Sequence, residues 1–341
     1  MKIIHIFSSG ISNINGVTNV VESLSEQQKN QGNEVVLINI KTEKAIPIIS
    51  EFIPDIVSFH GLYYIDYLRI AVYLKARNIP YVIQFHGGAS KDNYRKHRFK
   101  KMIANLFAFN LFVNGADATF YLSSGEYSKS IFRRCKKHFY ILPNGTERRD
   151  HFSEESHDGI VILFFSRIDV YGKGLDVLAK VINELSRTEA VGKVVFKFYG
   201  HIYESSRHFF DQFNNSIVEY CGVAYGQEKD YAYDNADIVI LPSRSEGMPL
   251  TVLEAFSYGR PVIVTPETNM GDVVLEKNLG WVSELTVDDL YNTIVKAAKD
   301  YLADKSGYRM RCFMASQLYS WDTVAKKSVE CYERVLKDHF S

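Results

Sequence analysis

The strongest indication of the fold is the stretch Ser243-Arg-Ser-Glu-Gly-Met-Pro-Leu-Thr-Val-Leu-Glu-Ala-Phe256. One apolar run, Ile238–Leu241, precedes it and another, Val262–Val264, follows, so the pattern predicts a strand, a loop, a helix and a second strand. Two carboxylates, Glu246 and Glu254, lie near the start of the predicted helix. A helix start that follows a parallel strand is where α/β folds bind anions. Because amides suit phosphate and carboxylates accept hydrogen bonds from hydroxyls, the pattern points to a sugar-phosphate ligand.

The same rhythm of short apolar runs and longer helical patterns continues along the whole chain. Strands are predicted at residues 2–7, 34–40, 56–59, 81–85, 118–122, 138–142, 160–165, 194–199, 217–220, 238–241 and 261–264. Helices are predicted at residues 17–31, 64–77, 97–115, 124–135, 174–187, 204–214, 228–235, 249–258, 270–277, 286–302 and 322–339. Most of these strands are continuous apolar runs, as expected of parallel strands covered on both faces. The sequence therefore predicts an α/β protein with doubly wound parallel sheets.

A polar, charged connector interrupts the rhythm, which restarts near residue 158. The chain has 341 residues, a length that suggests two domains. We predict one Rossmann-like domain over residues 1–153 and another over residues 158–320, followed by a helix at about 322–341. Two such domains facing each other would bind ligands in the cleft between them, at the carboxyl ends of their strands.

The composition, 46% apolar and 23% charged, allows sizeable cores. The first apolar run, residues 2–7, is too short for a signal peptide, and the sequence has no apolar run of about 18 residues that would predict a membrane span. The cysteines have no C-x-x-C spacing, which favours a reduced, cytoplasmic protein without a zinc site; they are Cys135, Cys221, Cys312 and Cys331.

A net charge of zero hides a contrast between the two halves of the chain. Residues 1–150 carry 20 Lys+Arg against 12 Asp+Glu, a net charge of +8, whereas residues 151–341 carry 20 against 28, a net charge of −8. The basic half predicts an anionic surface or partner. A dense basic cluster next to an apolar-aromatic segment can bind an anionic membrane surface; its residues are Lys96, Arg98, Lys100 and Lys101. A solvated charge run beside a buried helix is an equally open interpretation, and no sequence motif favours nucleic acid.

Three other strand-to-helix turns carry candidate ligand-binding residues. Arg167 and Lys173 follow strand 160–165 and could together clamp a diphosphate, because arginine offers a bidentate fork and lysine a point charge. His86 ends strand 81–85 and precedes two glycines, which let the backbone approach a ligand. Gly16 lies at a helix start where phosphate could approach. The alternatives are a solvated loop, a structural histidine and an ordinary turn.

Taken together, these segments resemble retaining glycosyltransferase family 4, whose members have the two-domain GT-B fold. The resemblance covers nearly the whole chain in order, and the E-x7-E pair Glu246/Glu254 is its most specific part. The other matching segments are the glycine loop at Gly16, His86-Gly87, Pro143-Asn-Gly145, Arg167 with Lys173-Gly-Leu-Asp176, Cys221-Gly-Val223, Ala236-Asp-Ile-Val-Ile-Leu-Pro-Ser243 and Trp321 with the terminal helix. The resemblance implies that this last helix crosses back onto the first domain.

The resemblance also implies that a nucleotide-sugar donor binds mainly to the second domain. Arg167 and Lys173 would hold the diphosphate and stabilise the leaving nucleoside diphosphate. Glu254 would accept hydrogen bonds from ribose hydroxyls, and Glu246 from hydroxyls of the donor sugar. His86 would face the sugar and phosphate from the first domain. Amides of Gly16, Gly247, Met248 and Leu250 would line the sugar and phosphates, Pro249 would shape the turn because it has no N–H, and Val223 would lie near the base.

The mechanism implied by the resemblance retains the anomeric configuration, with front-side attack and no dedicated enzymatic nucleophile. We expect no metal and no cofactor, since the chain has no D-x-D motif and catalysis would rest on positioning and charge neutralisation. The acceptor would be a glycan or a polyprenyl-linked glycan in surface polysaccharide synthesis, and the protein would be cytoplasmic or peripheral on the inner face of the membrane. One departure from the family pattern, Thr268-Asn-Met-Gly-Asp272, leaves open how the loop after strand 261–264 meets the donor sugar.

Two carboxylates in a sugar site also suggest the acid and nucleophile of a glycoside hydrolase. The neighbouring cations and the doubly wound architecture argue against it, so Glu246 and Glu254 are interpreted as groups that recognise hydroxyls. The alternatives that stay open are a GT-B nucleotide-sugar epimerase, an inverting transferase, and a non-catalytic subunit that binds nucleotide sugars.

Overall fold

The computed structural model describes the chain except for residues 9–15, 90–107, 133–137, 154–158, 189–192 and 214–216. Its contacts divide the chain into two compact units. The first unit comprises Met1–Gly145 together with Tyr319–Ser341, and the second comprises Thr146–Leu318. The C-terminal helix thus belongs with the first unit, as the GT-B resemblance implied. Among the helices that the structure describes, none has the length and apolarity needed to span a lipid bilayer.

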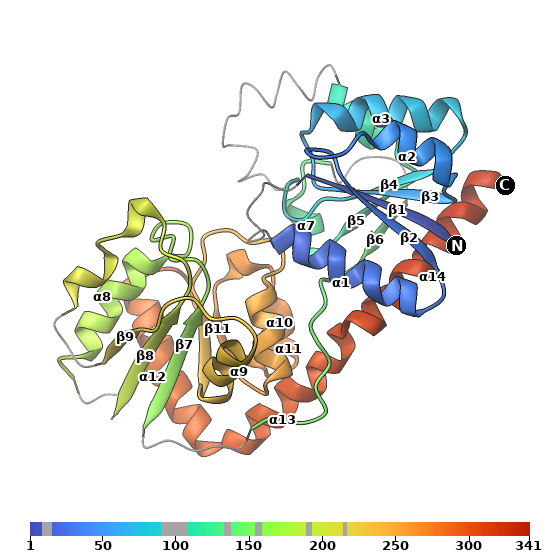
Figure 1. The fold of residues 1–341 in the computed structure, drawn as a ribbon. Coiled ribbons are helices and arrows are strands. Elements are labelled where there is room, and N and C mark those ends of the chain that lie inside the picture. Colours follow the sequence, from blue (N-terminus) through green and yellow to red (C-terminus); the bar gives the residue numbers. More distant parts are fainter. Residues whose placement is uncertain (9–15, 90–107, 133–137, 154–158, 189–192, 214–216) are drawn as a thin grey trace. The chain divides into compact units, whose positions relative to one another are not determined.

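The first unit is a six-stranded parallel sheet in the order β2-β1-β3-β4-β5-β6, with helices on both faces (Figure 1). Its elements are β1 (Lys2–Phe7), α1 (Gly16–Asn30), β2 (Glu34–Asn39), α2 (Ala45–Phe52), β3 (Ile56–His60), α3 (Ile65–Ala76), β4 (Tyr81–Gln84), α6 (Asn110–Gly115), β5 (Ala118–Tyr121), α7 (Ser124–Lys129), β6 (His138–Ile141) and α14 (Trp321–Phe340). Every residue of β3 and β4 is buried, including the polar Ser58, His60 and Gln84.

The two faces of this sheet differ in chemistry. One face presents side chains such as Ile6, Phe59 and Ile83 to a large aromatic and aliphatic cluster with α2, α3 and α6. The opposite face presents His5 and His60, which are 0% and 1% exposed. Helices α1 and α14 pack against each other on that side (Figure 1).

A glycine and a tryptophan fix the start of α14 on the first unit. A Cβ atom at Gly145 would lie only 2.3 Å from the Trp321 ring, so the close packing of backbone on indole requires glycine there. Trp321 is the first residue of α14 and is 6% exposed. The Pro143-Asn-Gly145 segment and Trp321 of the resemblance therefore meet in one contact.

The second unit repeats the architecture with a parallel sheet in the order β12-β11-β10-β7-β8-β9. Its elements are β7 (Ile160–Phe165), α8 (Leu175–Leu185), β8 (Val194–Tyr199), η2 (Glu204–Ser206), η3 (Phe209–Gln212), β9 (Val218–Tyr220), α9 (Gln227–Asp234), β10 (Ile238–Leu241), α10 (Leu250–Ser257), β11 (Val262–Val264), η4 (Pro266–Thr268), α11 (Gly271–Glu276), β12 (Gly280–Val282), α12 (Val287–Ala303), α13 (Lys305–Ser316) and η5 (Gln317–Tyr319), the last of which leads into α14. Helix α8 packs against α12, and α10 packs against α13.

All eleven predicted strands form, but several helix predictions need correction. Residues 204–213 form two 3-10 turns in place of a helix, because Phe209 and Phe210 both pack on Phe198 of β8. Helix α7 ends at Lys129, well before the predicted limit at 135. Among the described residues, the prediction lacks α2, β12 and α13, together with the short 3-10 turns η4 and η5.

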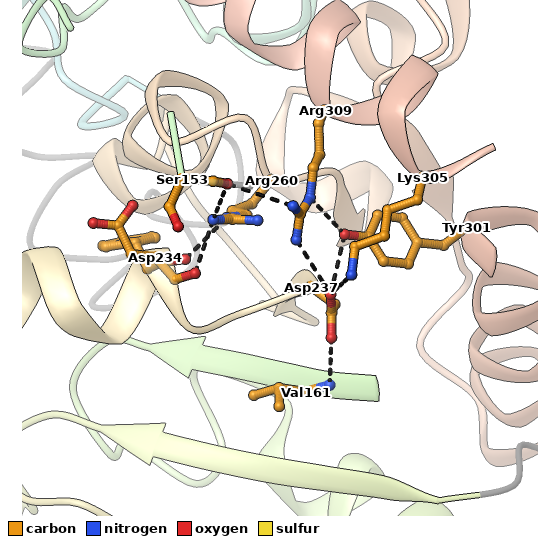
Figure 2. A network of polar contacts seen from close by, with 9 residues as sticks. Ser153, Val161, Asp234, Asp237, Arg260, Tyr301, Lys305 and Arg309 are labelled. Atoms are coloured by element: carbon orange, nitrogen blue, oxygen red, sulfur yellow. Dashed lines mark hydrogen bonds and ion pairs between the residues drawn. The ribbon is translucent and has the colours of Figure 1, made fainter. Parts of the chain in front are cut away.

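A buried ionic network closes the amino-terminal edge of the second sheet (Figure 2). Asp237, just before β10, accepts hydrogen bonds from Val161 N at 3.0 Å and Tyr301 Oη at 3.1 Å, and lies 3.2 Å from Lys305 Nζ. Arg309 lies 3.4 Å from the same carboxylate and 2.9 Å from Tyr301 Oη. The network thus ties α12 and α13 to the sheet.

Arg260 extends this network toward the segment that enters the unit. Its guanidinium is 0% exposed and donates to the carbonyls of Tyr233, Asp234 and Ser153 at 2.8–3.0 Å (Figure 2). Burial lowers the pKa of Arg260 to about 10, and the nearby Arg309 adds to the shift.

Candidate functional site

The candidate residues of the second unit lie in loops that follow the carboxyl ends of β7, β9, β10 and β11. Because these strands are parallel, the loops emerge at the same edge of the sheet. The edge is opposite the one closed by Asp237, which precedes β10.

Lys173 and Glu246, 73 positions apart in the chain, form an ion pair of 2.5 Å between Nζ and Oε1. The two side chains are only 10% and 18% exposed, so the pair is shielded from solvent. Gly174 makes this possible: it has φ +67°, and a Cβ there would lie 2.0 Å from the Pro242 carbonyl oxygen. The loop after β7 can therefore lie directly on the loop after β10.

Arg244 fastens the same two loops together. Its guanidinium makes a bidentate contact with Asp176, at 2.7 and 2.8 Å, and stacks on the Tyr171 ring at 4.2 Å. The Arg244 hydrogen bond holds the pKa of Asp176 below its usual value. The sequence interpretation gave neither residue a role of its own, although Arg244 lies within the opening stretch and Asp176 within the matching Lys173 segment.

Asn269 holds the backbone of the Glu246 loop. Its side-chain amide donates to the carbonyls of Glu246 and Gly247 at 2.7 and 3.1 Å, and its own backbone is left-handed at φ 58°. Glu246 N donates to the Glu267 carbonyl at 3.0 Å. The loop that departs from the family pattern therefore supports the glutamate loop through a residue that the sequence interpretation missed; asparagine, which tolerates the left-handed conformation, was the available signal.

Glu254, in α10, is held by two neighbours in α9. Lys229 Nζ lies 3.1 Å from its Oε1, and Tyr233 Oη donates to its Oε2 at 2.9 Å. Burial, and then the charge of Glu254, keeps the pKa of Tyr233 well above its usual value, so the phenol stays a donor. Thr251 Oγ1 donates to the Phe165 carbonyl at 2.8 Å, which ties the start of α10 to the end of β7.

The predicted amide donors lie at the start of α10, where Pro249 is the N-cap residue and Leu250 the first helical residue. Met248 is 5% exposed and packs inward, whereas Gly247 is half-buried. Val252 N bonds to the Pro249 carbonyl at 3.2 Å, and because Pro249 carries no hydrogen-bonding side chain, its side chain does not cap the amides of Leu250 and Thr251.

Arg167 and Val223 are more exposed than the Lys173–Glu246 pair. Arg167 donates to Tyr203 Oη at 2.7 Å, away from the Lys173–Glu246 ion pair. Val223, which is 41% exposed, lines a cavity of about 450 Å³ together with Tyr199, Cys221 and residues of α9. Because α9 also carries Lys229 and Tyr233, this cavity and Glu254 share one helix.

His86 lies just after β4 in the first unit and has a left-handed backbone, φ 49°. Burial, and then the nearby His5, lowers its pKa to about 3, so its imidazole is neutral. The next residue, Gly87, donates its amide to Glu126 Oε1 at 2.5 Å, and Leu122 N donates to Glu126 Oε2 at 2.6 Å. Glu126, which the sequence interpretation missed, is 1% exposed, and burial raises its pKa.

The remaining predicted residues are less informative. Gly16 is the exposed first residue of α1, and a Cβ there would meet no atom within 4 Å, so packing does not require glycine. The predicted membrane cluster lies outside the described residues: Lys96, Arg98, Lys100 and Lys101. Within the described part of the chain, no group of three or more His, Cys, Asp or Glu side chains could hold a metal ion.

Comparison with known proteins bears on the same unit. Residues 159–300 match a family model described as "Glycosyl transferases group 1". A relative named glycogen synthase 2, from Nitrosococcus oceani, is 25% identical over 226 residues. That alignment covers 62% of this chain and 45% of the relative, so the chain spans about half of that protein.

Solved structures extend the likeness to both units. Sucrose-phosphate synthase from Thermosynechococcus elongatus aligns over 99% of this chain and all of its own, with a TM-score of 0.75 and 15% identity. The Anabaena protein HepE, in complex with UDP, aligns over 98% of this chain and all of its own, with a TM-score of 0.73 and 14% identity. At such identities the likeness establishes the fold, and the predicted GT-B architecture is confirmed. Residues 159–300 thus match the glycosyl transferases group 1 family model, on a chain with the GT-B fold.

Proposed function

We propose that this chain is a retaining glycosyltransferase that moves a sugar from a nucleoside-diphosphate sugar to a glycan or lipid-linked glycan. The observation that carries the proposal is the shielded Lys173–Glu246 pair beside the start of α10, inside a glycosyl transferases group 1 domain. In a glycoside hydrolase the two carboxylates act directly on the scissile bond. Here each glutamate is paired with a lysine, Glu246 with Lys173 and Glu254 with Lys229, which favours recognition of hydroxyls instead.

The Lys173–Glu246 pair is suited to a ligand that carries both phosphate and hydroxyl groups. The ammonium of Lys173 has three donors, so the pair leaves donors for diphosphate oxygens. Glu246 retains acceptor sites for sugar hydroxyls after its one contact with Lys173. Arg167 would add a second positive charge, and the amides at the start of α10 would complete the stabilisation of the leaving nucleoside diphosphate.

The nucleoside would extend from the diphosphate toward α9. Glu254 would accept hydrogen bonds from ribose hydroxyls, and the cavity at Val223 would take the base. The UDP in the HepE complex supports a nucleotide ligand for this fold. His86, on the first unit, keeps its predicted role toward the donor sugar.

The acceptor side of the proposal rests on charge. Residues 1–150 carry a net charge of +8, which suits an anionic acceptor or membrane surface in surface polysaccharide synthesis. Co-sedimentation with anionic liposomes should fall with added salt and with removal of charge at Lys96, Arg98, Lys100 and Lys101. Salt-insensitive binding would contradict this part.

The transfer itself is tested by the release of nucleoside diphosphate from a panel of nucleotide sugars, with and without EDTA. We expect Lys173→Met and Glu246→Gln each to lower turnover about 100-fold or more, and EDTA to have no effect. Lys296→Met is the matched control, because Lys296 is exposed and forms its ion pair with Asp300 one helical turn away. Activity that survives both site substitutions would refute the assignment of the site.

The product separates the remaining alternatives. Retention of the donor's anomeric configuration, measured by NMR, supports the proposed mechanism, and inversion identifies the other class of transferase. A free epimeric sugar as the sole product would identify an epimerase. Calorimetry that detects no binding of any nucleoside diphosphate would refute the donor site altogether.

A further inference from the structure

A line of buried hydrogen bonds runs across the first unit from α14 to His86. Ser328 of α14 contacts Gln28 of α1 at 2.9 Å, and Gln28 contacts His5 of β1 at 2.7 Å. His5 contacts His60 of β3 at 2.8 Å, and His60 contacts His86 at 2.8 Å. The strands β1, β3 and β4 are neighbours in the sheet, so the imidazoles follow one another across it, with ring centroids 5.0 and 5.1 Å apart.

Ser328, at the far end of this line, determines which group donates and which accepts in each of its hydrogen bonds. Its Oγ lies 2.6 Å from the carbonyl oxygen of Ala325, and two oxygens at that distance require a hydrogen between them. The carbonyl has none, so the hydroxyl hydrogen of Ser328 points at Ala325. The Oγ of Ser328 can then only accept from Gln28, which orients the amide with Nε2 toward Ser328 and Oε1 toward His5.

The direction passes from ring to ring because a neutral imidazole has one donor and one acceptor nitrogen. The Oε1 of Gln28 only accepts, so His5 carries its hydrogen on Nε2 and accepts at Nδ1. His60 must then donate from Nε2 to His5 and accept at Nδ1. His86 must in turn donate from Nε2 to His60, which leaves its Nδ1 without a hydrogen.

The environment keeps all three rings neutral and enclosed. His5 and His60 are 0% and 1% exposed, and burial lowers the pKa of His5 to about 4 and that of His60 well below its usual value. Two hydroxyls lie beside the line: Ser58 Oγ is 3.5 Å from His60 Nε2, and Tyr332 of α14 contacts Ser58 and Gln28. The contact between His60 and His5 is 0.7 Å shorter than that between His60 and Ser58, so it decides the position of the hydrogen.

We propose that Ser328, Gln28, His5 and His60 are positioning residues that hold His86 as a single tautomer, with Nδ1 as a hydrogen-bond acceptor for a substrate hydroxyl. This rests on the proposed function only in naming the hydroxyl as that of a donor sugar. Among the described residues, His86 hydrogen-bonds through Nε2, to His60, and its Nδ1 has no hydrogen-bond partner. The consequence is that the C-terminal helix determines which kind of group His86 offers to a ligand.

The proposal is tested by nitrogen-15 NMR of the full chain labelled in histidine, since the ring nitrogen shifts separate protonated from unprotonated positions. His86→Asn assigns the signals by their loss. In the wild type we expect one tautomer of His86, with Nε2 protonated and Nδ1 unprotonated. A protonated Nδ1, or a mixture of tautomers, would overturn the proposal without any further variant.

Gln28→Glu is designed to reverse the donor and acceptor roles along the line. A carboxylate beside His5 favours the imidazolium, whose Nδ1 then donates to His60, so that His60 donates from Nδ1 to His86 and His86 carries its hydrogen on Nδ1. We expect near-complete exchange of the His86 tautomer. Gln31→Glu is the matched control, because Gln31 bonds to the Asp322 carbonyl of α14 at 2.9 Å outside the line. An unchanged His86 tautomer in a folded Gln28→Glu variant would show that Gln28 does not determine the tautomer through His5 and His60.

Addition of donor sugars tests the role toward ligand separately from turnover. When a nucleotide sugar that stabilises the chain is bound, the Nδ1 signal of His86 should shift, and a deoxy or fluoro analogue that lacks the donating hydroxyl should leave it in place. No shift with any bound donor would overturn the ligand-facing role. The tautomer measurement would still stand, and failure of sugar transfer alone would affect neither result.

Discussion

The hydrogen-bonded line of the first unit joins a serine hydroxyl, an amide and three neutral imidazoles, whereas the ionic network of the second unit joins two arginines and a lysine to an aspartate and to backbone carbonyls. In the first, each group both donates and accepts, so the line from Ser328 to His86 has a direction. In the second, arginine and lysine only donate, so the contacts converge on the Asp237 carboxylate and on backbone carbonyls (Figure 2).

This difference in hydrogen-bonding groups determines what each network can do. A directed line of neutral groups can transmit which atom carries a hydrogen, and it ends at a candidate functional residue. A converging set of charges transmits nothing of that kind, but it fixes position strongly because each charge depends on the others. Acid should therefore weaken the first network, and removal of one charge should weaken the second.

The largest expected effect is a loss of unfolding free energy in mild acid, caused by the histidines of the first unit. The folded-state pKa values of His5 and His86, about 4 and about 3, lie below the value of 6.5 for a free histidine, so the unfolded chain takes up protons first as pH falls. Stability from these groups is fully present above pH 6.5 and falls by ~1.4 kcal/mol per pH unit for each histidine, until the folded-state pKa is reached. Between pH 7 and 5 the two together should lower the unfolding free energy by about 4 kcal/mol, with His60 acting in the same direction.

Urea unfolding at pH 7, 6 and 5, followed by a probe in the first unit, measures this slope. The His5→Asn variant should lose about one histidine's share of it, whereas His208→Asn, at an exposed position, should not change it. An equal slope in the His5→Asn variant and the wild type would show that the buried imidazoles do not set the acid sensitivity.

Next in size is Asp237→Asn in the second unit. The substitution keeps one acceptor oxygen, replaces the other with an amide NH2, and leaves Lys305 and Arg309 without their counter-charge, so we expect a loss of about 3 kcal/mol in unfolding free energy. Asp304→Asn is the matched control, since Asp304 is half exposed in its pair with Arg311 and should cost no more than about 1 kcal/mol. Equal losses in guanidinium titrations would mean that burial adds nothing to the Asp237 contacts.

Local sequence signals predicted the fold because buried parallel strands are continuous apolar runs. The missed elements lack such signals: α2 contains Pro47, and β12 has three residues. Local spacing also led to the prediction of Glu246, Glu254, Arg167 and Lys173 as site residues. Their supports were not predicted, because these come from afar in the chain: Arg244 and Asp176 are 68 positions apart.

The histidine line shows the same limit more sharply. His5, His60 and His86 each looked like a strand residue or a turn residue on its own, and Gln28 lies 300 positions from Ser328. No local pattern relates them, since the order of strands in the sheet brings them together. Asparagine at position 269 indicated a left-handed turn, but its role as a support was not predicted, because its targets are backbone carbonyls, which carry no side-chain signature.

A smaller loss is expected from Arg260→Met, which sharpens the distinction within the second network. Arg260 bonds to three carbonyls and to no carboxylate in the network of Figure 2, and one of its terminal nitrogens, Nη1, has no partner among the described residues. Methionine fills a similar volume and removes the cost of a buried charge. The loss in unfolding free energy should therefore come from the carbonyls left without a donor, about 1–2 kcal/mol. A loss as large as that of Asp237→Asn in the same titration would show that Arg260 is bound as tightly into the ionic network as Arg309.

The smallest effect is expected at the far end of the histidine line. Ser328→Ala removes one acceptor of the Gln28 amide, while Tyr332 remains beside it, so we expect a loss of about 1 kcal/mol and a retained His86 tautomer. Ser25→Ala is the matched control, because Ser25 makes the same kind of helical hydrogen bond, to the Val21 carbonyl at 2.7 Å, away from the line.

The double variant Ser328→Ala/Tyr332→Phe takes both α14 hydroxyls from Gln28. Its amide can then turn at little cost, because either orientation leaves one of its groups unsatisfied. Nitrogen-15 NMR should therefore show two tautomers of His86 where the wild type shows one, in a chain whose stability is otherwise close to that of Tyr332→Phe alone. A single tautomer in the double variant would show that Gln28 or the histidines themselves determine the His86 tautomer, and that α14 does not.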